Sequence, residues 1–471
     1  MARSQLTVLQ AHVAIGDPHV SSDDKNRLSI LSAIFEPLVR RAPRGMYSPC
    51  LAENWSTSED ARTWTFALRQ NAAFHHGEPL EADDVVASLC RVRDQAIGGE
   101  LGTQGVYQSY LEGSIIEALD VATVRLVTPV PMADLLDLLV ELPILPGGDL
   151  AQGLIGTGPY RLIDAGEAEV MTEAFDRYWG GKPVVQRLFW RGEPDPSERV
   201  RALLAAEADL ISAVPLDLHR KVEDASGVDL VSAASSVCST FMCNLNTGPC
   251  ADRRVRQALN YALDVPAIVE TVMVGSAELL TGPFTQLHLG FDPDVPAYPF
   301  DPALAHKLLA EAGYRDGITL TFDIPSVLPD EAPRLARQMA DQYGEVGIEL
   351  EVIEHTDRPA YAEMVRAKEM HDACCFDSSP LSTYRLLREK FHGGVRGPWW
   401  LGYRNAEVDA LIDKAQATAL SAKRQRLYQR IHRLIRDDAP WVFLYSPKLY
   451  WGIGPRAHGW QPRVDGLIGV S

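Results

Sequence analysis

Residues 51–86, LAENWSTSEDARTWTFALRQNAAFHHGEPLEADDVV, form the stretch that decides the fold. Within it, Trp64, Phe66 and Leu68 alternate with polar residues, which is the period of a half-buried β-strand. The turn HGEP follows, and the acidic residues of EADD then stand where a helix N-terminus favours negative charge. The stretch therefore predicts a strand, a turn and a helix, and its side chains form no catalytic set.

Strand and helix patterns alternate further along the chain. A helix is expected to begin with Asp301 as its N-cap and Pro302 at its first position. Residues 318–322 and 349–354 have the composition of strands, and residues 331–343 between them have a helical period. This strand-helix-strand order predicts an α/β lobe.

Size and charge exclude several classes of protein. The chain has 471 residues, whereas single hydrophobic cores stop growing near roughly 250–300 residues, so we expect two or three packed units. The formal net charge of −18 argues against a general affinity for nucleic acid. The most apolar run, 135–145, is too short and too interrupted by charge to span a bilayer.

The cysteine pattern does not indicate a disulfide framework. There are seven cysteines, an odd number, and none forms a C-x-x-C unit. We expect buried free thiols, and one bridge among Cys238, Cys243 and Cys250 remains an alternative.

Motifs for catalysis or metal binding are absent from the sequence. It contains no G-x-S-x-G, H-E-x-x-H or P-loop pattern. His75 and His76 are adjacent, so on a strand they would point in opposite directions and could not chelate one ion together. We therefore expect a protein that is not an enzyme, holds no cofactor and holds no metal, and a hydrolase is disfavoured.

Six further blocks accompany the opening stretch in a fixed order. Together with residues 51–86 they resemble the extracellular solute-binding proteins of peptide, nickel and opine ABC transporters, family 5, class C. The blocks are GTGPYRL at 156–162, YWGGKP at 178–183, RVRQALNYALD at 254–264, DPALAHKLLAEAGY at 301–314, EVDALI at 407–412 and KRQRLYQRIHRLIRDDAPWVFLY at 423–445.

The resemblance implies an α/β, two-lobed periplasmic-binding-protein fold (type II, class C) with an extra α/β subdomain inserted in the first lobe. Few chain crossings between lobes would allow rigid-body closure. The implied boundaries are 1–48, 156–238 and 443–471 for the first lobe, 49–155 for the insertion, 239–442 for the second lobe, and a hinge near 238–241 and 441–444.

The resemblance also implies a function. The chain would capture a small polar solute, such as a short or modified peptide, an opine-like compound or another anionic or zwitterionic molecule, and deliver it to an ABC permease in the inner membrane. Presentation of the ligand to a chemosensory receptor and transport of a nickel-type chelate are alternatives. We expect a periplasmic monomer that is not inserted in the membrane and has no nucleic-acid partner.

The first residues, MARSQLTVLQ, lack the apolar run of a secretory signal. We therefore expect the signal peptide to have been removed or to lie outside this sequence, unless the natural chain begins here.

In peptide-binding relatives, a Gly-Trp pair is followed shortly by an aspartate that accepts the peptide's amino terminus. Asp377-Ser378 replaces the Gly-Trp pair here, and Leu381 falls at the place of the aspartate, so an unmodified peptide is less expected and Asp377 is the substitute. Alternatives are that Ser378 or Ser379 caps a helix, that the asparagines form turns, and that one tryptophan packs in a core. The candidate ligand-binding residues are Asp377, Ser378, Ser379, Tyr384, Arg385, Arg396, Trp399, Trp400, Tyr403, Asn244, Asn246, His19 and Tyr107.

Overall fold

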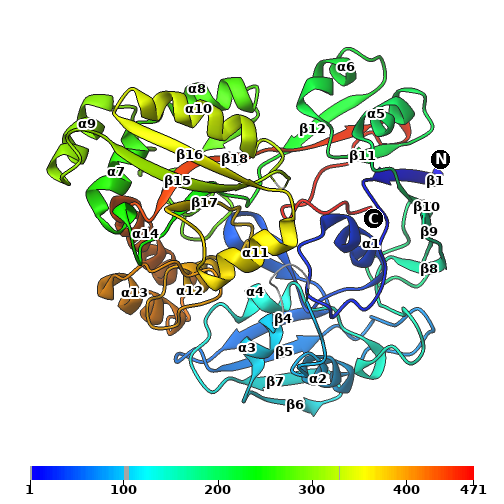
Figure 1. Cartoon of the computed structure of the whole chain (residues 1–471). Coiled ribbons are helices and arrows are strands. Elements are labelled where there is room, and N and C mark those ends of the chain that lie inside the picture. The colour runs from blue at the N-terminus through cyan, green and yellow to red at the C-terminus, as the bar shows by residue number, and fades with distance from the viewer. Residues whose placement is uncertain (1–2, 100–104, 328, 471) are drawn as a thin grey trace. The chain divides into compact units, whose positions relative to one another are not determined.

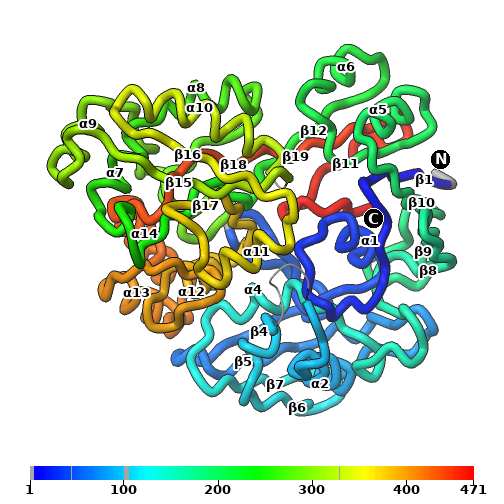
Figure 2. The backbone as a smooth tube through the Cα atoms, in the orientation of Figure 1, coloured from blue at the N-terminus to red at the C-terminus, as the bar shows by residue number. Residues whose placement is uncertain are grey.

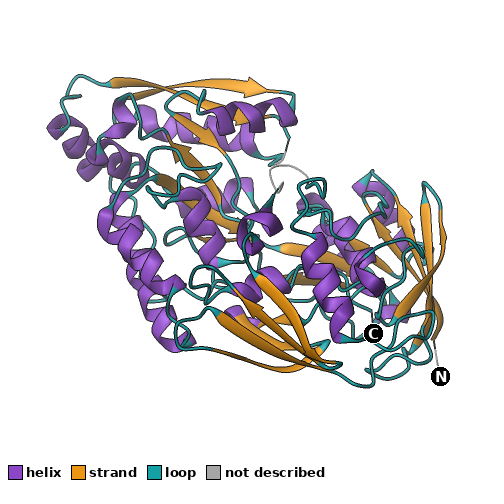
Figure 3. Cartoon of the chain, turned by 90° about the horizontal axis from the view of Figure 1, so that it is seen from below, coloured by secondary structure: helices purple, strands orange, loops and turns teal. Residues whose placement is uncertain are grey.

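The computed structural model describes residues 3–99, 105–327 and 329–470. It divides into two compact units. The first unit comprises residues 1–233 and 449–471, and the second unit comprises residues 234–448 (Figure 1). Both units contain helices as well as strands (Figure 3), as the predicted α/β class requires.

The main sheet of the first unit joins strands from both ends of the chain. β1 pairs in parallel with β10 on one side and β11 on the other, and β19 lies antiparallel between β11 and β12 (Figure 2). The order is β12 (Asp229–Ala233), β19 (Leu449–Ile453), β11 (Leu210–Ser212), β1 (Arg3–Gln10), β10 (Val185–Gly192), β9 (Glu169–Ala174) and β8 (Tyr160–Ala165).

A second, antiparallel sheet in the first unit contains the stretch that opened the sequence analysis. Burial alternates along β5, with Trp64, Phe66 and Leu68 inside, so the predicted strand is confirmed. The predicted helix follows as α2 (Ala82–Arg91), and Glu81 and Asp84 form a capping box at its start. The sheet order is β4 (Ala52–Thr57), β5 (Thr63–Leu68), β7 (Thr123–Val127) and β6 (Ile115–Asp120), and a separate pair is β2 (Val39–Ala42) with β3 (Met46–Pro49).

The glycines of GTGPYRL allow two backbones to approach closely. A Cβ atom on Gly156 or Gly158 would collide with backbone atoms of Ile34 at the end of helix α1. His75 lies beside them, with Nε2 3.0 Å from the Gly158 carbonyl oxygen. Burial lowers the pKa of His75 to about 4. These residues therefore act in packing, as expected for glycines without a following P-loop lysine.

The sheet of the second unit is mixed. β15 and β16 are parallel with helix α10 between them in the chain, which confirms the predicted strand-helix-strand order. β13 is buried along its whole length and pairs antiparallel with both β17 and β18. The order is β14 (Ala277–Leu279), β18 (Trp441–Pro447), β13 (Ser239–Cys243), β17 (Ala373–Cys375), β15 (Ile318–Pro325) and β16 (Ile348–His355).

Helix predictions with a capping residue are confirmed. Asp301 caps α9 by accepting from the backbone N–H of Leu304 at 2.9 Å. Within the apolar run 135–145, helix α4 covers only Leu135–Leu139. Helices of the first unit are α1 (Lys25–Ile34), α2, α3 (Val106–Leu111), α4, α5 (Pro196–Leu204) and α6 (His219–Glu223). Helices of the second unit are α7 (Arg253–Tyr261), α8 (Val265–Val272), α9 (Pro302–Glu311), α10 (Ala332–Gly344), α11 (Arg358–Ala367), α12 (Thr383–Lys390), α13 (Ala406–Gln416) and α14 (Ser421–Asp438).

The described residues contain neither a membrane-spanning helix nor a disulfide. Among the described residues, no helix is both long enough and apolar enough to cross a membrane. The seven cysteines are free thiols, six of them buried, so the alternative of a disulfide in the 238–250 region is wrong for this structure.

Candidate functional site

In the second unit, the chain after β17 continues along β13. The Phe376 N–H donates to the Thr240 carbonyl at 3.2 Å, and Ser378 and Cys238 exchange backbone hydrogen bonds of 2.8 and 3.1 Å. Asp377, which with Ser378 stands where the resemblance implies a Gly-Trp pair, is held between Phe376 and Ser378. Its backbone position is therefore fixed by the sheet.

The Asp377 carboxyl lacks the hydrogen bonds that a buried carboxylate normally makes. Its Oδ1 atom is buried and has no hydrogen-bond partner among the described residues. Burial, and next the negative charge of Glu331, raise the pKa of Asp377 from 3.8 to about 7. Arg358, the Ser239 hydroxyl and Lys390 act in the opposite direction. The group is therefore close to half-ionised at neutral pH.

The hydroxyl of the next residue is also unsatisfied. The Oγ atom of Ser378 is buried without a partner within the part of the chain that the structure describes, as is Oγ1 of Thr383 at the start of α12. The prediction that Ser378 or Ser379 caps the next helix is wrong. Ser382 is the N-cap of α12, because its hydroxyl accepts the Arg385 N–H at 3.0 Å.

Ser379 joins the segment to the start of the second unit. Its carbonyl oxygen accepts a hydrogen bond of 2.7 Å from the Ser236 hydroxyl. This contact anchors the backbone of the segment and leaves the Ser379 side chain partly exposed.

Two aromatic rings and a lysine lie next to this segment. The rings of Phe376 and Trp399 have centroids 4.7 Å apart. The Lys390 Nζ atom lies 5.8 Å from the first centroid and 5.6 Å from the second. We call Ser239, Phe376, Asp377, Ser378, Lys390 and Trp399 the Asp377 cluster.

Trp400, although adjacent to Trp399, belongs to a different set of contacts. Its Nε1–H donates to the Tyr403 carbonyl at 2.7 Å, and the Tyr403 hydroxyl donates to Asp438 at 2.7 Å. The guanidinium groups of Arg396 and Arg404 lie over the Trp400 ring at 5.3 and 5.5 Å. The structure thus separates the two tryptophans that the sequence placed together.

The remaining candidates of the second unit make contacts within the protein. Arg385 is paired with Glu389 at 2.8 Å, and Tyr384 is buried on the same helix. The Asn244 amide donates to the His371 carbonyl at 3.2 Å, and its oxygen accepts the Asn246 N–H at 3.1 Å. The turn-forming alternative therefore describes the asparagines.

The two candidates of the first unit are buried against backbone carbonyls. His19 Nε2 lies 2.8 Å from the Pro143 oxygen, and burial lowers the pKa of His19 to about 4. The Tyr107 hydroxyl donates to the Glu141 carbonyl at 2.8 Å. Both polar ends thus have protein partners.

Sequence reasoning missed Lys390 and Phe376. A signal for Lys390 was present: it follows Leu386 and Leu387 at helical spacing, on the buried stripe of α12. A charged residue in an apolar stripe is rarely buried without a partner. The signal was therefore specific, but the two rings that contact the Lys390 ammonium lie on other segments of the chain.

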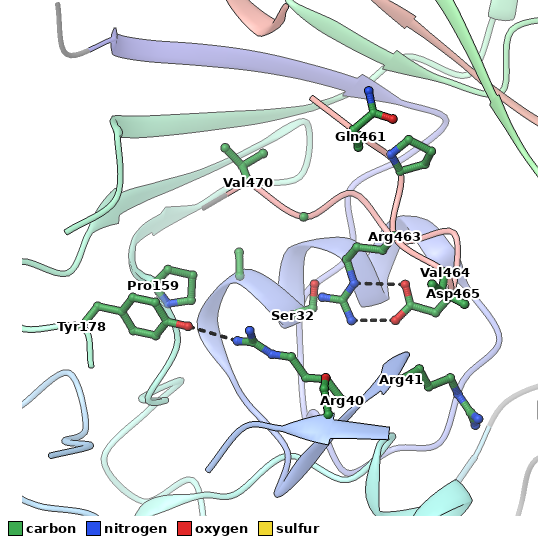
Figure 4. A pocket seen from close by; sticks show the side chains of 14 residues that line it. Ser32, Arg40, Arg41, Pro159, Tyr178, Gln461, Arg463, Val464, Asp465 and Val470 are labelled. Atoms are coloured by element: carbon green, nitrogen blue, oxygen red, sulfur yellow. Dashed lines mark hydrogen bonds and ion pairs between the residues drawn. The ribbon is translucent and has the colours of Figure 1, made fainter. Parts of the chain in front are cut away.

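The first unit contains a cavity of about 400 Å³ whose polar lining is already paired. Arg463 donates to both carboxylate oxygens of Asp465, at 3.0 and 2.6 Å, and Arg40 donates to the Tyr178 hydroxyl at 3.0 Å (Figure 4). The charge of Arg463 is neutralised by Asp465, and that of Arg40 by the carboxylate of Glu36.

Glu36 lies at the centre of the network behind this cavity. It accepts hydrogen bonds from Tyr178, Trp179 and Thr157 at 2.8, 2.7 and 3.1 Å, and it is ion-paired with Arg40. Tyr178-Trp179 of the YWGGKP block therefore has a structural role. Among the described residues, no three His, Cys, Asp or Glu side chains are grouped as metal ligands would be.

The family described as bacterial extracellular solute-binding proteins, family 5 (middle region), matches residues 46–377. The chain belongs to this family. The predicted resemblance is thereby confirmed.

Relatives of this family-5 chain extend over nearly its full length. The glutathione-binding protein GsiB of Escherichia coli K12 is 26% identical over 474 residues, covering 95% of this chain and 91% of GsiB. HbpA2 of Haemophilus parasuis has a TM-score of 0.86 at 24% identity, covering 99% and 98% of the two chains. NikA of Brucella suis, in complex with Fe(III)-EDTA, has a TM-score of 0.84 at 23% identity, covering 99% and 98%. The predicted two-lobed periplasmic-binding-protein fold is confirmed by these likenesses.

Proposed function

We propose that this family-5 protein is the binding component of an ABC importer that captures a small anionic or zwitterionic solute and does not alter it chemically. The observation that carries the proposal is the set of buried, unpartnered polar atoms in the Asp377 cluster, above all Oδ1 of Asp377 and Oγ of Ser378. Buried polar groups in native proteins nearly always have partners, and exceptions gather at functional sites.

A polar solute would supply the missing partners. An ammonium or hydroxyl of the solute would donate to Asp377, and a solute acceptor would receive the Ser378 hydroxyl. Trp399 and Phe376 provide a wall that excludes water and thereby strengthens these hydrogen bonds. The relative GsiB is named as a glutathione-binding protein. Glutathione is a modified tripeptide with charges of both signs, and it is the first solute to test.

Capture would take place by closure of the two units. The chain passes between them at residues 233–234 and again at 448–449, and two crossings suit rigid-body closure about a hinge. We place the lobes and the hinge, near 238–241 and 441–444, as the family resemblance implies. The solute would favour the closed state through contacts that the open state lacks.

The closed protein would be recognised by a permease in the inner membrane, from the periplasmic side. This assignment rests on family membership together with the names of the relatives, which are binding proteins. The protein would act as a monomer without cofactor.

Native mass spectrometry of freshly purified protein tests the proposal. We expect a retained solute and, on its addition to stripped protein, slower hydrogen exchange in residues 376–390. A solute that binds without protecting residues 239–442 would contradict closure around the Asp377 cluster. Turnover of the solute would show that the protein is an enzyme.

A further inference from the structure

Lys390 is the last residue of α12, and its environment is unusual for a lysine. The residue is 4% exposed, and its ammonium faces the rings of Phe376 and Trp399. Among the described residues it makes these ring contacts and neither a hydrogen bond nor an ion pair, and its Nζ atom is not fully enclosed by protein. Burying an ammonium group without a partner is costly, and contact with aromatic rings offsets only part of that cost.

Lys368, in the same unit, shows how a lysine of this protein is normally accommodated. It is half-buried, and its Nζ donates to the Pro398 carbonyl at 2.5 Å. Burial lowers the pKa of Lys368 to about 8, and burial likewise lowers the pKa of Lys390 to about 8. The two lysines thus share a lowered pKa, but Lys368 is half-buried with a carbonyl acceptor, whereas Lys390 is buried against two rings.

Positive charge gathers around the same two rings. The Arg358 guanidinium lies 4.7 Å from the Phe376 centroid, and the Arg366 guanidinium lies 5.2 Å from the Trp399 centroid. Of these two arginines, Arg366 is ion-paired with Glu363 at 2.6 Å, so it adds no free charge to that of Lys390.

The carboxyl groups near Lys390 stabilise its charge only in part. Glu389 acts to raise the pKa of Lys390, but it is ion-paired with Arg385 at 2.8 Å. Asp377 is near enough for Lys390 to lower its pKa, yet that pKa remains about 7, so the carboxyl is only partly charged at neutral pH. The ammonium of Lys390 can therefore still form an ion pair with a bound anion.

We propose that Lys390, walled by Phe376 and Trp399, is an anion subsite that selects solutes carrying a carboxylate or a phosphate. The subsite deepens the proposed function and rests on it. The solute anion would receive hydrogen bonds from the ammonium while its donor groups reach Asp377, which gives the cluster complementary ends for a molecule with both charges.

Three variants test the subsite: K390M and K390Q, which remove the charge, and K368M as the matched control. Each is stripped of solute and titrated calorimetrically with reduced glutathione and with its diethyl ester, which lacks both carboxylates. We expect K390M and K390Q to bind glutathione about 30-fold or more weakly than the unaltered protein, as for loss of a buried charge partner. K368M should bind as the unaltered protein does, and the ester should not distinguish the variants.

The pH dependence gives a second readout, which a purely structural lysine would not change. Affinity for the anion should fall as the pH rises above about 8, because Lys390 then loses its proton. The groups around Lys390 are Arg385 and Glu389 on α12, Arg358 and Arg366 on α11, Asp377, and the thiols of Cys238 and Cys374. Of these, Asp377 has a pKa of about 7, so D377N should remove the change in affinity near pH 7. K390R should remove the fall in affinity above about pH 8, because arginine keeps its charge there.

The mass of the solute retained in native spectra decides the remaining cases and tells a carboxylate from a phosphate. An acidic solute that is present in the unaltered protein and lost from K390M supports the subsite. An uncharged solute, or an acidic one retained equally by K390M, overturns the subsite and leaves the proposed function standing. If the unaltered protein retains no solute and binds neither probe, the proposed function fails and the subsite fails with it.

Discussion

Two buried carboxyl groups, one in each unit, have opposite surroundings. Glu36 of the first unit is 1% exposed and receives hydrogen bonds from Tyr178, Trp179 and Thr157 besides its ion pair with Arg40. Asp377 of the second unit has a buried oxygen with no partner among the described residues. One carboxylate is fully used by the fold, and the other is left available.

The difference separates structural from functional polar groups. A buried carboxylate with several donors holds segments together, and its loss leaves those donors unsatisfied. A buried carboxyl without donors destabilises the free protein, and such groups persist where a ligand completes them. A substitution at Glu36 should therefore lower the stability of the protein. A substitution in the Asp377 cluster should raise the stability of the solute-free protein and lower its affinity for the solute.

The largest effect is expected for E36Q. This change leaves the Arg40 charge without its carboxylate and should lower the free energy of unfolding by about 3–5 kcal/mol, as for a broken buried ion pair. Urea denaturation followed by circular dichroism measures it. E53Q is the control, because Glu53 is half exposed and its pair with Arg69 should contribute less than about 1 kcal/mol. Equal effects in the two variants would contradict the structural role of Glu36.

Replacement of Lys390 by methionine should stabilise the solute-free protein. The pKa of Lys390 in the folded protein, about 8, lies below the ordinary 10.5, so between these values the unfolded chain binds more protons. Stability therefore rises with pH through that window, and below pH 8 the folded protein bears the full cost of the charge. We expect a gain of about 2 kcal/mol at pH 7 that disappears above about pH 10.

Denaturation of K390M and K368M at pH 7 and pH 10 measures this gain. K368M removes a hydrogen-bonded lysine and should gain less. A loss of stability in K390M at pH 7 would mean that the contacts of the ammonium with the rings outweigh its burial, and the contrast between the units would be lost.

A smaller effect is expected for D377N. The pKa of Asp377 in the folded protein, about 7, lies above the ordinary 3.8, so its protonated form favours folding below pH 4 and that contribution is lost as the pH rises through 7. D377N should therefore match the unaltered protein at pH 4 and exceed it by about 1.5 kcal/mol at pH 8, a value reduced for partial exposure. A pH-independent difference would show that Asp377 does not titrate near neutrality.

The fold was predictable because its signals are local. Alternation along β5 and the cap Asp301 each depend on residues within one turn or strand, and each appears where predicted. The bounds of the short helix α4 were not predictable, because an apolar run alone does not tell helix from buried loop.

The candidate site was predictable only in part. Asp377 and Ser378 were selected from their place in the family pattern, and Trp399 as one of two adjacent tryptophans on a Gly-Pro loop; the structure brings these three into one cluster. Lys390 was missed because its burial depends on Phe376 and Trp399, which are separated from it along the chain. Trp400 was selected with Trp399, but its hydrogen bond to Tyr403 depends on the shape of the loop.

The smallest effect is expected for W399F, which tests whether the ring wall supports the charge of Lys390. Phenylalanine attracts a cation less strongly than tryptophan, so the ammonium should lose about 0.5–1 kcal/mol and its pKa should fall. Affinity for glutathione should drop roughly threefold at pH 7, and the upper limb of the pH profile should move below 8. W64F is the matched control: Trp64 is buried and stacked on Phe66 at 6.3 Å, and no cation among the described residues lies over its ring. If W399F leaves the pH profile of binding where it was, the ring fills space beside Lys390 without tuning it, because only a ring that stabilises the charged form can move the pH at which that charge is lost.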